Sequence, residues 1–399
     1  MKNKVIGLSV AVLVALSSLA GCSGTGSTGG SAKGDVIKVA TVTPLSGSQA
    51  AIGESIKNGA QLALEERVTE FGKLGIALKL DPQDDQADPK VGVAVANRLI
   101  NDKDILAVVG HYNSGVAIPS SEVYKKVNLV MVSPANTGVQ VTERGYENIN
   151  RICTRDDVQG PAAADFAQKE LGAKSAFVVH DKTTYGQGVA DEFKKQFEKS
   201  GGQVAGYEGL TAGESDFSAV LNKVASTKPD VLYFGGMYPE GSLLIKQMKE
   251  KQITAKFIGP DGMDSGEVIK IAGQSAIDTY FSSMAADVTQ SESGKAWAKT
   301  FEAKYKKAPE NWSVYGYDAM NVTLNALKNA IQANGGKKPT REQVVKAARQ
   351  TKGFKGIAAS VSFNSKGDNE EAEMFIYKFK EAKYPPSVVK SVKAKDYLK

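Results

Sequence analysis

Three consecutive segments decide the fold: IKVATV at residues 37–42, GESIKNGAQLALEERVTE at residues 53–70, and IALKL at residues 76–80. The first and third are short runs of β-branched and apolar residues, which are typical of buried strands. The middle segment carries apolar residues at helical spacing, so it predicts an amphipathic helix. A strand, a helix and a strand in this order predict one unit of a parallel sheet that is covered by helices.

The same alternation continues on both sides of a restart near Asn148–Asp157. Before the restart, the pattern predicts helices at Pro89–Asn101 and Ile118–Lys126, and strands at Ile105–Val109 and Leu129–Val132. After it, the pattern predicts strands at Ala176–His180, Val204–Tyr207, Val231–Phe234 and Phe257–Ile258, and helices at Gly188–Lys199 and Ser242–Lys251. Two α/β units, each a doubly wound parallel sheet, are the economical interpretation.

The chain beyond Tyr280 is longer than the second unit needs. The pattern there predicts helices at Ser293–Tyr305, Tyr315–Ala333 and Thr340–Gln350, and strands at Ile357–Phe363 and Met374–Phe379. We therefore expect the chain to return to the first unit and to form a hinge of several crossings. The expected lobes are 35–155 with 284–370, and 156–283 with 371–399. The lysine-rich end from Lys380 is expected to be a solvated tail that packs along one edge.

The first thirty-four residues are expected to direct export rather than to fold. Two lysines precede an apolar run at residues 5–19, which is shorter than the roughly 20 residues that a membrane-spanning helix needs. The tetrapeptide LAGC at residues 19–22 resembles the bacterial lipobox, in which the cysteine is acylated; the alternative is an ordinary signal peptide with a chance cysteine. We predict a signal peptide at 1–21, a lipid anchor at Cys22, and a flexible tether of glycine and serine at 22–34.

The composition excludes several classes of protein. A chain of 399 residues with 42% hydrophobic residues is long enough to bury two cores, so it is neither disordered nor a disulfide-stapled miniature. Two cysteines and two histidines leave little from which to build a metal site, so no metal and no cofactor is expected. The formal charge of +6 is too small and too dispersed to indicate a nucleic-acid partner.

Loops that follow the predicted strands carry the most informative side chains. In open α/β sheets, ligands bind outside the carboxyl ends of the strands, where helix N-termini attract anions. Ser114 and Thr137 lie in such loops and offer donors for a carboxylate, although both are also typical helix caps. Asp261 is the one acid at such a strand end in the second unit, where it offers an anion for an ammonium group or fixes a turn.

Catalytic patterns are missing from the sequence. The chain contains neither a Gly-x-Ser-x-Gly elbow nor a Gly-x4-Gly-Lys-Ser/Thr phosphate loop. His111 and His180 follow apolar strands in different halves and are interpreted as structural. Gly24, Gly26 and Gly29 match the spacing of a dinucleotide-binding loop, but no strand precedes them. The chain is therefore not expected to be an enzyme.

The order of several short motifs resembles the substrate-binding proteins of branched-chain amino acid ABC transporters, the Leu/Ile/Val-binding type of periplasmic binding protein. The resemblance runs from Val36 to about Phe379. Each motif alone is weak evidence for the family, but together and in this order the motifs are strong evidence. The motifs are Asp84–Pro89, Val109–His111, Ser133–Thr137, Arg155–Pro161, His180–Lys182 with Tyr185 and Gly186, Thr211–Phe217, and Gly259–Gly262.

The resemblance implies a fold and a set of ligand contacts. The family has two α/β domains joined by three hinge crossings, and it closes on its ligand like a clamshell. It implies that Ser114, Ala135 and Thr137 hold the α-carboxylate of an amino acid, that Asp261 holds its ammonium group, and that Tyr185 covers it. Tyr112, Ile52 and Met237 would complete the site. Ile52 and Met237 stand where relatives have tyrosine, so the resemblance does not give the affinity order.

The implied function is capture of a neutral, branched-chain aliphatic L-amino acid outside the cytoplasm and delivery to an ABC permease. The expected partners are that amino acid, the permease subunits and a membrane surface, and the protein is expected to be a monomer. The open alternatives are a ligand sensor that reports to a signalling partner, and a receptor for another small ligand such as an amide. The sequence leaves open the exact amino acid, the membrane that holds the anchor and the identity of the permease.

Overall fold

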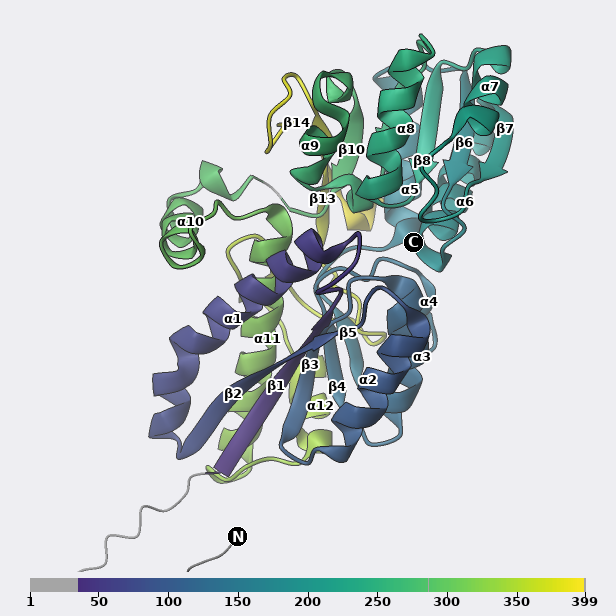
Figure 1. Cartoon of the computed structure of the whole chain (residues 1–399). Helices are drawn as coiled ribbons and strands as arrows, with labels where there is room; N and C mark the ends of the chain where they lie inside the picture. Colours follow the sequence, from purple (N-terminus) through teal and green to yellow (C-terminus); the bar gives the residue numbers. More distant parts are fainter. Residues whose placement is uncertain (1–34, 286, 398–399) are drawn as a thin grey trace, which may run out of the picture. The chain divides into compact units, whose positions relative to one another are not determined.

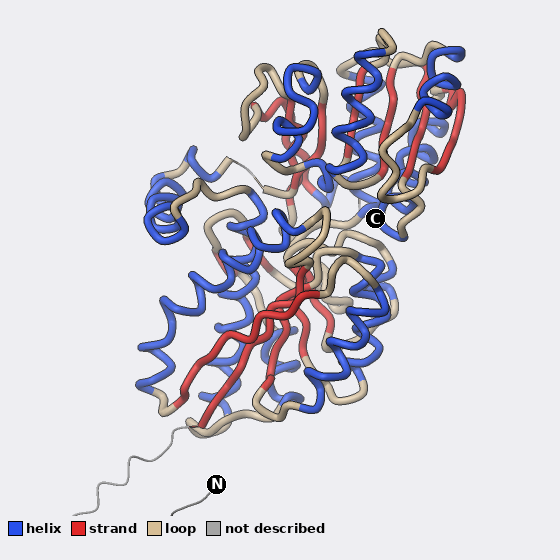
Figure 2. Tube along the Cα trace, in the orientation of Figure 1, coloured by secondary structure: helices blue, strands red, loops and turns tan. Residues whose placement is uncertain are grey.

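The computed structural model describes residues 35–285 and 287–397. The predicted signal peptide, the anchor at Cys22, the tether and the three glycines at 24, 26 and 29 lie outside these residues. Within the described part, the strands form two large sheets, each flanked by helices, and one short two-stranded sheet (Figure 2). The alternation of strands and helices along the chain is the reason, because neighbouring parallel strands need a crossover that packs on a face of the sheet.

The first sheet is entirely parallel and has the strand order β2-β1-β3-β4-β5. Its strands are β1 (Asp35–Thr43), β2 (Ile76–Asp84), β3 (Ile105–Gly110), β4 (Val130–Ser133) and β5 (Ile149–Arg151). The helices of this lobe are α1 (Ala50–Lys73), α2 (Pro89–Asn101), α3 (Ser114–Lys125), α4 (Gln140–Glu143), α11 (Asn311–Ala333) and α12 (Arg341–Arg349). α1 packs beside α11 and α2 beside α3, so segments far apart in the sequence cover one sheet (Figure 1).

The second sheet has the order β14-β13-β10-β9-β8-β6-β7, in which only the β10–β13 and β13–β14 pairs are antiparallel. Its strands are β6 (Ser175–His180), β7 (Gln203–Gly209), β8 (Val231–Gly235), β9 (Lys256–Gly259), β10 (Tyr280–Ser283), β13 (Glu373–Lys378) and β14 (Ser387–Lys393). The longer helices between these elements are α5 (Asp156–Lys169), α6 (Thr184–Lys199), α7 (Ser218–Thr227), α8 (Tyr238–Glu250), α9 (Glu267–Ala272) and α10 (Glu292–Tyr305).

Local sequence signals explain where individual helices begin. Asp88 caps α2 by accepting from the backbone N–H groups of Lys90 and Val91 at 2.7 and 3.1 Å, and Pro89 occupies the first turn. Thr340 and Gln343 form a reciprocal capping box at the start of α12. These signals give α2 the predicted bounds and α12 bounds within one residue of the prediction.

The chain crosses between the two sheets three times, as the fold class predicts. It leaves the first sheet after β5, returns after β10 to enter α11, and leaves again ahead of β13. The buried Arg151 joins the first crossing to the third, because its Nε donates to Oδ1 of Asp368 at 2.6 Å. Arg155 also donates to Asp368, at 3.0 Å, so one carboxylate ties two arginines of the first crossing to the third.

Two predicted features near the C-terminus differ from the structure. The predicted strand at Ile357–Phe363 is wrong: only the short pair β11 (Phe354–Lys355) and β12 (Ser360–Val361) forms. The reason is Asp318, whose carboxylate accepts from three successive backbone N–H groups at 2.8 Å each and bends the chain around it. The lysine-rich end does pack along an edge, and residues 387–393 form the paired strand β14.

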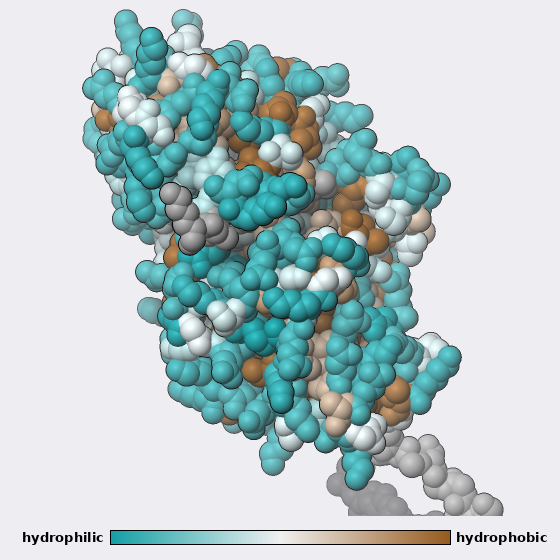
Figure 3. Space-filling view, turned by 180° about the vertical axis from the view of Figure 1, so that it is seen from behind, coloured by the Kyte–Doolittle hydropathy of each residue, from teal (hydrophilic) through white to brown (hydrophobic). Residues whose placement is uncertain are grey.

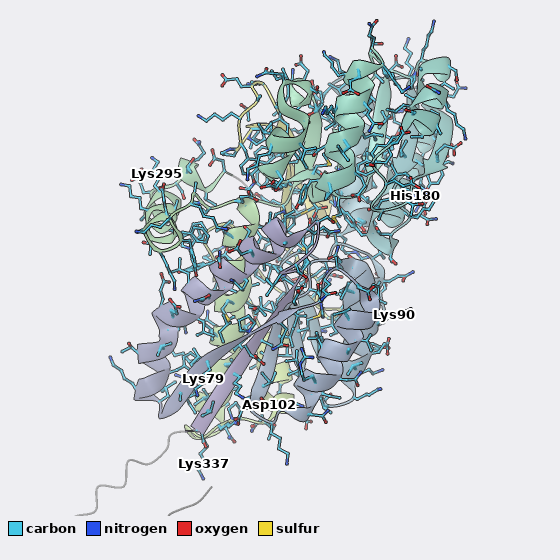
Figure 4. All side chains as sticks on the ribbon, viewed as in Figure 1. Lys79, Lys90, Asp102, His180, Lys295 and Lys337 are labelled. Atoms are coloured by element: carbon cyan, nitrogen blue, oxygen red, sulfur yellow. The ribbon has the colours of Figure 1, made fainter. Side chains whose placement is uncertain are left out.

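Charge and apolar groups are scattered over the described surface. Lysines on different elements, among them Lys79, Lys90, Lys295 and Lys337, point outward from separate places (Figure 4). On the face seen in Figure 3, hydrophilic side chains dominate and the apolar ones form small separate groups. No helix among the described residues is long and apolar enough to cross a membrane.

Candidate functional site

The predicted site residues all lie at or just beyond the carboxyl ends of parallel strands, where such sheets bind ligands. Each of the eight side chains is at least nine-tenths buried. In the first lobe they lie in the first turn of α1, in the loop between β3 and α3, at the start of α3, and in the loop after β4: Ile52, Tyr112, Ser114, Ala135 and Thr137. In the second lobe they lie at the start of α6, just before α8 and just after β9: Tyr185, Met237 and Asp261.

A buried asparagine holds the loops of the first lobe in place. The Oδ1 atom of Asn136 accepts from the backbone N–H of His111 at 3.1 Å and from the hydroxyl of Ser133 at 2.8 Å. Its Nδ2 donates to the carbonyl of Tyr112 at 2.8 Å. The loop after β4 is therefore bonded to the loop after β3, which fixes Ala135 and Thr137 relative to the start of α3.

Ser114 and Thr137 are not helix caps in the structure. The Oγ of Ser114 accepts from the backbone N–H of Gly138 at 3.1 Å, and the N-cap of α3 is Asn113, without a side-chain cap. The Oγ1 of Thr137 is buried and has no hydrogen-bond partner among the described residues. The hydroxyl of Thr137 nevertheless lies near enough to the carboxylate of Asp156 to favour the ionised form of that acid, so the two groups are partly paired and a bound group would complete the pairing.

Asp261 forms the acidic wall of the second lobe. Tyr185 donates its hydroxyl to Oδ1 of Asp261 and accepts from the backbone N–H of Gly262 at 3.0 Å. The backbone N–H of Asp261 donates to Oε1 of Gln159 at 2.7 Å. Burial raises the pKa of Asp261 to about 6 despite these hydrogen bonds. No arginine, lysine or histidine among the described residues forms an ion pair with it.

Side chains from the two lobes meet at the apolar part of the site. The hydroxyl of Tyr112 contacts the sulfur of Met237 at 3.5 Å, and the ring of Tyr112 packs edge-on against Trp312 at 5.5 Å between centroids. Ile52 is fully buried in the same hydrophobic cluster as these side chains. This apolar wall is suited to an aliphatic side chain and offers it no charged partner.

A direct hydrogen bond joins the lobes beside this wall. Tyr238, at the start of α8, donates its hydroxyl to the carbonyl of Ser48 in the first lobe at 2.5 Å. The start of α3 also faces the start of α6: a methyl group added to Gly115 would lie 3.5 Å from Oγ1 of Thr184. The two walls therefore face one another with little space between them.

The structure adds residues that the sequence did not reveal. Gln159 receives the backbone N–H of Asp261 and the hydroxyl of Ser282 on one oxygen, at 2.7 and 2.6 Å. Asp156, at the start of α5, is 1% exposed, and its Oδ2 has no hydrogen-bond partner among the described residues. Trp312 comes from α11, far along the chain. Asp156 and Gln159 lie in the motif Arg155–Pro161, but that motif did not assign them to the site, and only the fold brings the three residues to the strand ends.

Neither histidine is placed for catalysis. The buried His111 ring is held between Oδ2 of Asp85 at 2.8 Å and the hydroxyl of Tyr124 at 3.1 Å. His180, labelled in Figure 4, ends β6, accepts from the backbone N–H of Lys182 at 3.2 Å and packs against Tyr207. No cluster of three metal-binding side chains is present in the described part. Both histidine rings therefore have partners within the fold.

Other hollows of the described surface lie away from these residues. A cavity of about 620 Å³ near the crossings is lined by charged side chains. A second, of about 490 Å³, lies at the N-terminal end of β9, and a third, of about 380 Å³, lies along residues 355–375. None of the eight predicted site residues lines them. A smaller cavity of about 170 Å³ lies between α3 and α6 and reaches Asp156.

Comparisons with known proteins agree with this fold. A family model described as periplasmic binding protein matches residues 36–384. The Leu/Ile/Val-binding protein homolog 2 of Brucella abortus is 37% identical over 341 residues, which cover 85% of this chain and 89% of that protein. The amino acid binding protein of Pseudomonas aeruginosa is 36% identical over 348 residues, which cover 86% and 90%.

A solved structure shows the same similarity in three dimensions. The leucine binding protein LivK of Thermotoga maritima aligns with a TM-score of 0.83 and 29% identity, over 90% of this chain and 99% of that one. The strand order, the crossings and the sequence match therefore point to one group of proteins. The chain belongs to the periplasmic binding protein family, among the branched-chain amino acid substrate-binding proteins of ABC transporters, which bind a substrate and are not enzymes.

Proposed function

We propose that the protein captures a neutral, branched-chain aliphatic L-amino acid and delivers it to the permease of an ABC importer. The observation that carries this proposal is the pairing of two buried walls. One wall holds the buried hydroxyl of Thr137, which is incompletely paired, and the other holds Asp261, which has no cationic partner among the described residues. A zwitterion offers an acceptor to the first wall and a positive charge to the second.

The carboxylate arm of the ligand would bind to the first lobe. α3 begins at Ser114, and its first backbone N–H groups point out of the helix without intrahelical acceptors, so they attract an anion. Thr137 and the backbone at Ala135 lie in the loop that Gly138 bonds to Ser114 at this helix start and that Asn136 bonds to the loop before it. Donors from a helix N-terminus and from a hydroxyl are well suited to a carboxylate.

The ammonium arm would bind to Asp261. Tyr185 fixes one carboxyl oxygen of Asp261 and covers the site from the second lobe. An ammonium group would stabilise the ionised form of Asp261, whose pKa burial raises to about 6 in the protein alone. A ligand without a positive charge leaves this buried carboxyl uncompensated, which disfavours amides.

The ligand side chain would lie against Ile52, Tyr112 and Met237. An apolar pocket distinguishes side chains by about 1 to 3 kcal/mol per methylene, so leucine, isoleucine and valine are favoured over alanine. The printed names of the relatives, Leu/Ile/Val-binding and amino acid binding, support this class of ligand. The replacement of two hydroxyls by Ile52 and Met237 makes this pocket more apolar.

Closure of the cleft would bury the ligand between two lobes, 35–155 with 284–370 and 156–283 with 371–399. The hydrogen bond from Tyr238 to Ser48 would hold the closed form. We also propose that the protein is exported and held at the outer face of a membrane by acyl chains on Cys22. Loss of membrane association in a Cys22→Ala variant, measured by fractionation, would support the anchor, and unchanged association would contradict it.

Isothermal titration calorimetry with leucine, isoleucine, valine, alanine and phenylalanine tests the binding function. We expect binding of the branched-chain members with one site per chain, and loss of binding in Asp261→Ala with an unchanged far-UV spectrum. A matched control is Asp165→Ala on α5, which removes a carboxylate outside the site. Absence of heat and of thermal stabilisation with every member of this panel would contradict the proposal.

A further inference from the structure

Two acidic residues that bind no ligand in the proposed site lie where the two lobes meet. They are Asp264, which follows η1 (Asp261–Met263) in the second lobe, and Glu310, the N-cap of α11 in the first lobe. Asp264 is fully buried and Glu310 is half-buried. Asp264 comes three residues after Asp261, and Glu310 comes two residues before Trp312, so both acids are continuous with the walls of the site.

Hydrogen bonds across the lobes hold these two acids. In one direction, Nδ2 of Asn311 in the first lobe donates to Oδ2 of Asp264 at 2.9 Å. In the other direction, the hydroxyl of Ser265 donates to Oε2 of Glu310 at 3.4 Å, and a methyl group added to Gly266 would lie 3.1 Å from Oε1 of Glu310. Each lobe therefore places an acid against the other lobe, and separation of the lobes would break both sets of contacts.

The two acids are not equally well compensated. Tyr384, in the loop between β13 and β14, donates its hydroxyl to Oδ1 of Asp264 at 2.7 Å and accepts from the backbone N–H of Asn311 at 3.4 Å. Ser283, at the end of β10, also donates its hydroxyl to Asp264. Three side chains thus donate to Asp264, whereas Glu310 accepts only one long hydrogen bond from a side chain of the described part. Glu310 is therefore the acid whose charge is harder to accommodate.

The groups that face Glu310 from the surrounding elements are mostly acidic or neutral. They lie after η1, on α9, at the start of α8, in the loop after β13 and in the loop after β3: Asp264, Glu267, Tyr238, Tyr384 and Tyr112. The cations are Lys307, ahead of α11, and Lys270 on α9. Both are exposed and are paired with other carboxylates, Lys307 with Glu54 at 3.2 Å and Lys270 with Glu267 at 2.5 Å.

We propose that Glu310 is a pH-sensitive latch between the lobes, which close more readily when its carboxyl is protonated than when it is ionised. This inference rests on the proposed amino acid function and concerns the regulation of that site. Closure brings an ionised Glu310 against Asp264 and removes it from water, and both effects disfavour the second negative charge. In the open form the same carboxyl would be solvated, so its ionisation would carry no such penalty.

The raised pKa of Glu310 gives the direction of the pH effect. Burial and the neighbouring Asp264 raise this pKa from the usual 4.5 to about 7 while the lobes are in contact. A carboxyl whose pKa is higher in the closed form stabilises that form fully below its open-form pKa, and the contribution is lost as the pH rises through about 7. On account of Glu310 alone, ligand affinity should therefore fall roughly 10- to 30-fold between about pH 5.5 and 8.5.

Calorimetric titration of the full-length wild type and Glu310→Gln across this pH range tests the latch. The probe is the amino acid of the five-member panel that the wild type binds most tightly. Glutamine keeps the acceptor but cannot ionise, so Glu310→Gln should match the wild type within about twofold at the acidic end and bind about 10-fold more tightly at the alkaline end. The ratio of the two Kd values isolates Glu310, because both proteins share every other titrating group. A merely structural defect would weaken binding, whereas the latch predicts a gain.

Two further variants complete the experiment. Glu302→Gln removes the same charge from an exposed position on α10 and should follow the wild-type pH profile. Lys307→Gln removes a cation that lowers the pKa of Glu310, so it should move the fall in affinity to higher pH. This variant also serves if Glu310→Gln does not fold.

The outcomes separate failure of the latch from failure of the proposed function. A wild type that binds an amino acid, with a Kd ratio to Glu310→Gln that stays constant over the pH range, overturns the latch and leaves the amino acid function standing. Where Lys307→Gln takes its place, a fall in affinity at an unchanged pH has the same meaning. A folded wild type that binds none of the five amino acids overturns the amino acid function and the latch with it.

Discussion

Removal of the Tyr238 hydroxyl is expected to weaken the binding of every amino acid by the same factor. The hydroxyl donates to the carbonyl of Ser48 across the two lobes, so the proposed opening would break this bond and closure would form it. A hydrogen bond between uncharged groups contributes about 1 kcal/mol net, and a buried carbonyl left unpaired costs about 1–3 kcal/mol. Ser48 is exposed, so water can replace the lost donor and the lower figure applies. Tyr238→Phe should therefore raise Kd about fivefold.

The assay is titration of wild type and Tyr238→Phe with leucine, isoleucine and valine, together with stopped-flow dissociation rates. The loss should fall mainly on the dissociation rate, because the bond holds the closed form. Tyr207→Phe is the control, since that hydroxyl bonds to Asp191 within the second lobe. An unchanged Kd, or a loss that differs by more than about threefold between the ligands, would refute the role of Tyr238 as a closure contact.

Three other perturbations test separate parts of the structure. The pKa of Asp156 is about 8 when folded, against about 3.9 for an unfolded carboxyl, so the folded state holds the extra proton and ligand-free stability should fall as the pH rises from about 4 to 8. Thermal melts of Asp156→Asn should show a shallower fall; an equal slope would contradict this. The larger side chain of Gly115→Leu should push against Thr184 and prevent closure, so binding should be lost at an unchanged melting temperature. Gly115→Ala should bind normally, because its Cβ would make only an ordinary van der Waals contact with Thr184. Asp318→Asn should lower stability by about 2–4 kcal/mol in denaturant unfolding, since a charged acceptor of three backbone N–H groups is lost; a change below about 0.5 kcal/mol would contradict that role.

Much of the fold follows from local sequence pattern, and the failures have physical causes. α2 has its predicted bounds because Asp88 and Pro89 mark its start. α3 begins at Ser114, four residues before the predicted start, because its first turn contains Gly115 and the β-branched Val116, which are poor helix formers. The segment Ile357–Phe363 has a composition typical of a strand. Its first three backbone N–H groups, however, donate to the carboxylate of Asp318, which is distant in sequence.

The site divides in the same way between local and long-range information. Loops after strands are recognisable from sequence, and so Ser114, Thr137 and Asp261 could be named as candidates. Gln159 reaches Asp261 across 102 residues, and a contact of this kind has no local pattern. Asp156 stands at a helix start, where an acid is commonplace, and only the burial of its carboxyl distinguishes it.

The shared carboxylate of Asp368 has a consequence for how the molecule moves. Because it holds both Arg151 and Arg155, the first and third crossings are fastened to each other and cannot bend independently. If the lobes open as proposed, these bonds would favour rotation about a single axis over twisting and sliding. Ligand exchange should follow one relaxation rate, and a mutation that frees Asp368 would add a second mode of motion rather than simply loosen the first.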